Sequence, residues 1–186
     1  MILDNLLTFT GTSNGASGGI TAGAQTDLPT TGTQVASNII DLGVTSGVPT
    51  SANGGGARDI GTGDDPSLKL SVIVTTALTG GTSLGLILAG APDNGSGAPG
   101  SYTTMWQSPA VVAEANLLAG VQLANIDVPR PAPGQVLPRF LRLSFVSVGT
   151  HTAGAVEAQI VIDRDDQVLA TTGAYSGYPA GITVAN

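Results

Sequence analysis

The chain has 186 residues, 41% of them hydrophobic, and its 13 acidic and 6 basic residues give it a net charge of −7. This length suits one domain with a proper core, and the scarcity of basic residues argues against binding to nucleic acid or to an anionic membrane surface. The lack of cysteine in the sequence excludes disulfides, iron–sulfur clusters, thiolate zinc sites and cysteine nucleophiles.

Charged residues make up only 10% of the chain, against about 25% in ordinary soluble domains. A free-standing monomer usually carries more charge, so we expect part of the surface to meet another protein. The sequence opens Met1-Ile2-Leu3-Asp4-Asn5, which does not resemble a secretory signal. No apolar run approaches the roughly 20 residues that span a bilayer.

In chain order, residues 6–10 and 35–42 are the first, weaker strand candidates, and the Gly- and Thr-rich stretch 11–33 between them is predicted to be a loop. Clear apolar alternation follows at residues 68–75 and 84–89, which predicts two strands with one face in the core. Asp93-Asn94-Gly95, within the predicted loop 92–100, is a strong turn signal.

The second half of the chain continues the pattern. Residues 102–107 and 121–126 are weaker strand candidates, and 110–118 is the best helix candidate. The proline-rich stretch 128–138 cannot join a central ladder. Alternation is again clear at 141–146 and 156–163.

Together these patterns predict an all-β domain, an antiparallel jelly roll or β-sandwich of about eight strands. We expect residues 1–186 to form one domain with extended N-terminal (1–8) and C-terminal (174–186) segments. The tail carries Tyr175 and Tyr178, aromatic side chains that need a surface on this domain or a neighbour.

Candidate chemical groups are few. His151, the only histidine, is expected to be an exposed turn residue with no nucleophile beside it. The densest acidic cluster is a weak calcium candidate, and we favour a strand end turning into solvent over a metal site there; it consists of Asp163, Asp165 and Asp166. Asp64 and Asp65 are expected to lie in a turn, and Trp106 in the core. We therefore expect neither catalysis nor a cofactor.

Several short motifs, in this order, give the chain a resemblance to a known family. They are Met1-Ile2-Leu3-Asp4-Asn5 with Phe9, Ala36-Ser37-Asn38-Ile39-Ile40-Asp41-Leu42-Gly43, Ala57-Arg58-Asp59-Ile60-Gly61-Thr62-Gly63, Leu117-Leu118-Ala119-Gly120, Arg139-Phe140-Leu141-Arg142-Leu143 and Tyr175-Ser176-Gly177-Tyr178. In these places the sequence resembles the jelly-roll cement (decoration) proteins of tailed-phage heads, a family represented in a Bordetella phage.

The resemblance implies a structural virion protein that is assembled in the host cytoplasm. A homodimer or homotrimer would bind the outer surface of an HK97-type capsid, bridge major capsid protein subunits and stabilise the DNA-filled head. Arg58 and Asp59 are our candidates for orienting polar contacts, although they could equally pair with each other or cap a turn. The alternative is a carbohydrate- or receptor-binding jelly roll of a virion adhesin, with Trp106 or Tyr102 as the sugar platform.

Overall fold

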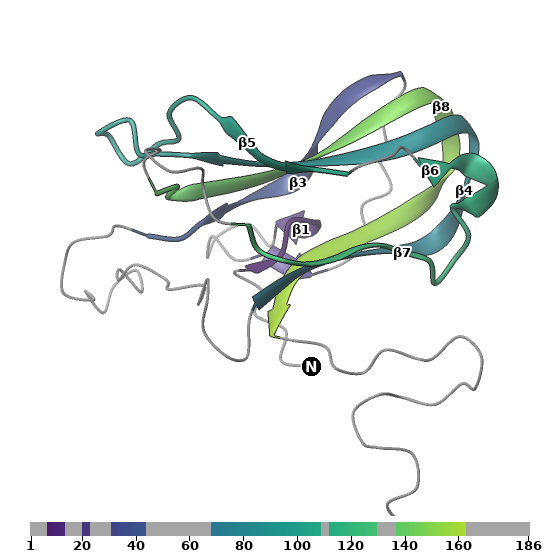
Figure 1. The fold of residues 1–186 in the computed structure, drawn as a ribbon, viewed down its shortest axis with the longest axis horizontal. Helices are drawn as coiled ribbons and strands as arrows, with labels where there is room; N and C mark the ends of the chain where they lie inside the picture. Colours follow the sequence, from purple (N-terminus) through teal and green to yellow (C-terminus); the bar gives the residue numbers. More distant parts are fainter. Residues whose placement is uncertain are drawn as a thin grey trace, which may run out of the picture.

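The computed structural model describes residues 7–13, 20–22, 31–43, 68–108, 112–129 and 137–162. Within these ranges it is almost entirely β-structure and contains no α-helix (Figure 1). The strands are β1 (Gly11–Ser13), β2 (Ile20–Ala22), β3 (Gly32–Asp41), β4 (Leu68–Ala91), β5 (Thr103–Gln107), β6 (Val112–Ala113), β7 (Gln122–Asp127) and β8 (Phe140–Ile162). All strand pairs are antiparallel, and the predicted all-β fold is confirmed.

Two very long strands, β4 and β8, form the backbone of the fold. They pair along their whole length, from Leu68 opposite Ile162 to Ala91 opposite Phe140. The register shifts repeatedly between Val74 and Ser83, where the ribbon bends and folds back over itself (Figure 1). Each long strand therefore contributes to two layers, and the strands that we predicted separately at 68–75 and 84–89 are two halves of β4.

The first layer consists of β3, residues 140–148 of β8, residues 83–91 of β4, and then β5 and β6. The second layer consists of residues 155–162 of β8, residues 68–76 of β4, and β7. In Figure 1 these are the upper and lower layers. β1 and β2 form a separate two-stranded sheet, so part of the predicted loop 11–33 is strand.

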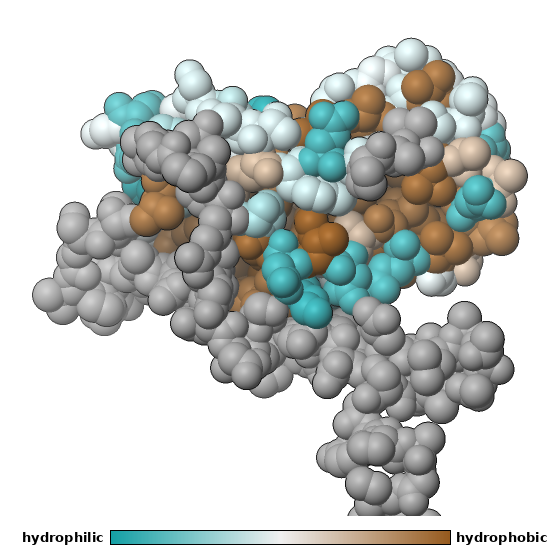
Figure 2. Space-filling view, viewed as in Figure 1, coloured by the Kyte–Doolittle hydropathy of each residue, from teal (hydrophilic) through white to brown (hydrophobic). Residues whose placement is uncertain are grey.

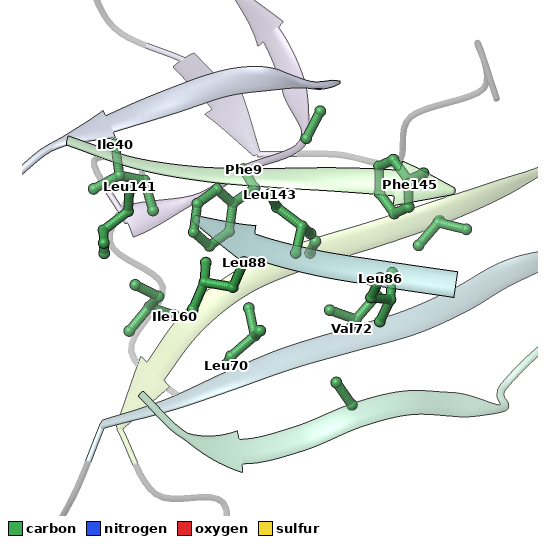
Figure 3. Close-up of a cluster of buried hydrophobic side chains, with 14 of the residues drawn as sticks. Phe9, Ile40, Leu70, Val72, Leu86, Leu88, Leu141, Leu143, Phe145 and Ile160 are labelled. Atoms are coloured by element: carbon green, nitrogen blue, oxygen red, sulfur yellow. The ribbon is translucent and has the colours of Figure 1, made fainter. Parts of the chain in front are cut away.

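The core lies between the two layers, as the alternation predicted. Side chains from both halves of β4 and of β8 point into it, and most are completely buried (Figure 3). These are Leu70, Val72, Val74, Leu84, Leu86, Leu88, Leu141, Leu143, Phe145, Val156, Ala158 and Ile160. Trp106 of β5 packs against this cluster but is only partly buried, so the core position expected for it is met only in part.

One open side of the sandwich is closed by the segment at residues 7–10. Phe9 N–H donates to Ala158 O of β8 at 2.9 Å, and Phe9 O accepts from Asn38 N–H of β3 at 2.9 Å. The segment thus connects the edges of both layers, and it inserts the fully buried Phe9 ring between them. Asn38 can reach it because β3 has a register shift between Val35 and Ile39.

The opposite side is partly closed by the connection between β6 and β7. It contains the 3-10 turn η2 (Glu114–Asn116), followed by the fully buried Leu117. Leu117 O accepts a hydrogen bond from Leu78 N–H at 3.0 Å, which fixes the turn to the bend of β4. The helix predicted over 110–118 is wrong, because β6 and this single turn replace it.

Candidate functional site

Among the described residues, one group of charged side chains joins the ends of three segments of the first layer. Arg139, just before β8, binds Asp41 at the end of β3 through two hydrogen bonds, Nε to Oδ1 and Nη2 to Oδ2, both 2.9 Å long. Its Nη1 donates to Asp93 Oδ2 in the loop after β4. We call Asp41, Asp93 and Arg139 the arginine clamp.

Local turns position both carboxylates of the clamp. Asp41 Oδ1 also accepts from Gly43 N–H at 2.8 Å. Asp93 Oδ1 accepts from Gly95 N–H at 2.7 Å and from Gly97 N–H at 3.0 Å, and Gly95 has the positive φ of +90° that this turn requires. The predicted turn at Asp93-Asn94-Gly95 is confirmed.

The electrostatics of the clamp favour the charged forms of its groups. The Asp41 carboxylate, followed by that of Asp93, raises the pKa of the Arg139 guanidinium beyond its ordinary value. The backbone N–H groups of Gly97 and Gly95, with Arg139, hold the pKa of Asp93 below its ordinary value. Groups held so firmly in one charge state are suited to fixing geometry and not to proton transfer.

A second arginine lies three residues further along. The Arg142 guanidinium stacks on the ring of Tyr102, with its carbon 3.8 Å from the ring centroid. Burial raises the pKa of the Tyr102 hydroxyl, although the nearby Arg142 charge acts in the opposite direction. The Arg142 Nε and the Tyr102 hydroxyl are buried, and neither has a hydrogen-bond partner among the described residues.

Comparison with known protein families identifies the family of the chain. The family model Bbp16 matches residues 22–160 of the chain. The chain belongs to the Bbp16 family. The family name points to a Bordetella phage protein, so the predicted resemblance is confirmed at that level. No curated protein matches the chain.

The Bbp16 match covers the clamp residues together with Tyr102 and Arg142. It ends before the calcium candidates Asp163, Asp165 and Asp166 and before the tail tyrosines Tyr175 and Tyr178. Those residues, and also Arg58, Asp59, Asp64 and Asp65, lie outside the residues that the structure describes.

The clamp also brings together two of the motifs that carry the family resemblance. Asp41-Leu42-Gly43 ends one motif and Arg139-Phe140 begins another, and β3 pairs with β8 so that Asp41 lies opposite Phe140. Both motifs can be recognised in the sequence, but nothing in them predicts that they meet. Complementary charges at the ends of two predicted strands were the signal that could have suggested the contact.

His151 corrects a prediction. It lies within β8 at the bend, is only 8% exposed, and is not an exposed turn residue. Its ring covers Gly81, where a Cβ atom would come within 2.3 Å of the His151 Cε1 atom. The glycines around His151 allow the ribbon of β4 and β8 to bend, whereas the sequence pattern suggested a hairpin turn at this place.

Polar and apolar surfaces are separated on the face drawn in Figure 2. Hydrophilic side chains lie along β7, and apolar ones gather between the two layers toward the bend (Figure 2). Partly buried apolar side chains that pack against the core from β5, β6 and β7 include Met105, Trp106, Val112, Leu123 and Ile126.

Two features are absent from the described part of the chain. No group of three or more His, Cys, Asp or Glu side chains in it could hold a metal ion. None of its helices is both long and apolar enough to cross a membrane.

Proposed function

We propose that this protein is a non-enzymatic cement protein that binds the outer surface of a phage capsid and bridges major capsid protein subunits. Membership of the Bbp16 family, whose name points to a Bordetella phage, is the observation that carries the proposal. The low fraction of charged residues, 10%, supports an extensive protein contact.

The architecture suits a protein that has to carry a mechanical load. Strands β4 and β8 pair in both layers and pass through the bend as continuous strands, so a load on one layer passes to the other along both strands. The arginine clamp holds together the end of β3, the loop after β4 and the start of β8. A domain of this kind can resist deformation while repeated weak contacts to the shell add up by avidity.

The partners in this proposal are the major capsid protein and further copies of the same chain, as a homodimer or homotrimer. We propose that residues 1–6 and 174–186 add contacts to neighbouring subunits. Truncation should stop before Leu7, because Leu7 packs against the core and Thr8 bridges to Gln159. Removing either segment is expected to weaken binding to heads, and unchanged binding would contradict this part of the proposal.

The adhesin alternative depended on a free aromatic platform. Trp106 packs against the core, and Tyr102 carries Arg142 on its ring. Neither arrangement favours sugar binding, so we retain the cement function alone.

Electron cryomicroscopy of the virion tests the proposal. Density for this fold on the outside of the head, at junctions between capsid subunits, is the expected result. Density confined to the tail or its fibres would overturn it.

A further inference from the structure

The outer face of the first layer carries an arginine, Arg142, that forms no ion pair with any carboxylate of the described residues. Arg142 alternates with the core residues Leu141 and Leu143, so its side chain lies on the outside of the sandwich. Ile39 of β3 is directly opposite Arg142, and Val35 is opposite Ser144 on the same face. Ile39 and Val35 are each 39% exposed.

The neighbouring clamp shows how unusual this arrangement is. The Arg139 side chain binds two carboxylates, whereas the Arg142 side chain has no hydrogen bond or ion pair to any of the described residues. Its Nε is buried without a partner, and leaving part of a charged group unpaired has a free-energy cost. The guanidinium plane is nevertheless held in one place by the Tyr102 ring. Ala89, the β4 residue opposite Arg142, is small and leaves room for a long side chain on this face.

We propose that Arg142, Tyr102, Ile39 and Val35 form a contact spot that receives an Asp or Glu carboxylate of the major capsid protein, flanked by an apolar side chain. A planar guanidinium that is already oriented can bind a carboxylate through two parallel hydrogen bonds. Arginine and tyrosine are also enriched among the residues that dominate interface energies. This inference rests on the proposed cement function.

The size of the spot favours the shell over a second copy of this chain as its occupant. A stable dimer interface buries about 800 Å² on each partner, and two exposed β-branched side chains beside one arginine contribute a small part of that. A small spot is effective when the partner repeats many times in a shell, because the contacts act together. One well-placed cation then fixes orientation without requiring a basic surface.

Heads of the parent phage assembled without this protein provide the test. Wild type and Arg142→Gln are added to such heads, and binding is measured at increasing protein concentration. We expect Arg142→Gln to bind the heads at least about tenfold more weakly than wild type. Arg142→Lys should recover only part of this loss, and Ile39→Asp should also bind more weakly than wild type. Val148→Asp is the matched control, since Val148 is exposed on the same strand, about 20 Å further along, and should bind as wild type does.

The outcomes separate the two proposals. If wild type does not bind the heads, the cement function itself fails. If wild type binds and Arg142→Gln binds equally well, only the contact spot is wrong. Light scattering completes the test: a change in oligomeric state on Arg142→Gln would assign the spot to a second copy and overturn the proposed partner.

Discussion

At the residue scale, the protein uses two arginines that are close in sequence in different ways. Arg139 is committed to Asp41 and Asp93, and its side chain is 17% exposed. Arg142 is stacked on Tyr102, and no carboxylate of the described residues binds its side chain. The same residue type therefore stabilises the fold in one position, and we propose that it binds a partner in the other.

This difference predicts unequal effects on stability. Arg139→Gln should lower the free energy of unfolding by roughly 1–2 kcal/mol, since it removes charge-assisted hydrogen bonds that are partly screened by solvent. Arg142→Gln should change it by less than about 0.5 kcal/mol. Urea denaturation of the two variants measures both values, and equal losses would contradict the distinction.

Asp93 predicts a specific pH dependence. Its folded-state pKa lies below the ordinary value of 3.8, so it stabilises the fold above that value, and this contribution is lost as the pH falls through the lowered folded-state pKa. Asp93→Asn removes the titration while keeping an oxygen that can accept from Gly95 and Gly97. Stability measured from roughly pH 5 to pH 2 should therefore fall less steeply in this variant. Parallel curves would refute the role of Asp93.

The contact between Gly81 and His151 predicts that substitutions at these two positions have non-additive effects on stability. Gly81→Ala should destabilise the protein by about 1–3 kcal/mol, because the new methyl group would collide with the His151 ring. The same change combined with His151→Ala should cost less than the sum of the single changes. A double-mutant cycle with thermal denaturation tests this, and strict additivity is the result that we do not expect.

At the element scale, the segment at residues 7–10 acts as a closing piece between the layers. It forms hydrogen bonds to both β8 and β3, and it contributes one large aromatic ring to the core. A short segment can have this effect because the long ribbon leaves the edges of the two layers unconnected on that side.

Phe9→Ala therefore predicts a large loss of stability. Removing a fully buried aromatic ring typically costs about 3–5 kcal/mol. Leu118→Ala is the control, because Leu118 is 57% exposed, and it should stay within about 0.5 kcal/mol of wild type. Chemical denaturation gives the stability of both variants. Similar unfolding midpoints for Phe9→Ala and Leu118→Ala would contradict the stabilising role of Phe9.

The sequence predicted the core better than the connections between its parts. Alternation at Leu70, Val72 and Val74 marked the buried face, because period-two burial depends only on local pleating. The continuity of β4 through Gly80 and Gly81 was missed. Adjacent glycines usually indicate a turn, whereas here they permit a bend under the His151 ring.

The arginine clamp and the contact spot could not be predicted from the spacing of their residues along the sequence. Asp41 and Arg139 are 98 positions apart, and only the β3–β8 pairing brings them together. Tyr102 and Arg142 meet because the loop before β5 places Tyr102 on the same face of the first layer as the Arg142 side chain. Long-range pairing of strands decides both contacts, and no local pattern specifies it.

At the scale of the whole molecule, the described residues form a folded ribbon around one connected core, and the chain carries few charges. We propose that this body is a rigid connector between capsid subunits. Such a role requires many identical copies, because a capsid presents the same junction repeatedly. Copy number is consequently the property that separates a cement protein from a virion protein that is present in few copies.

The most direct test is the stoichiometry of this protein in purified, tail-free heads. Quantitative mass spectrometry against the major capsid protein should give about one copy per capsid subunit, since the proposed sites repeat over the whole shell. A few copies per particle, or recovery with tails and not with heads, would contradict the account.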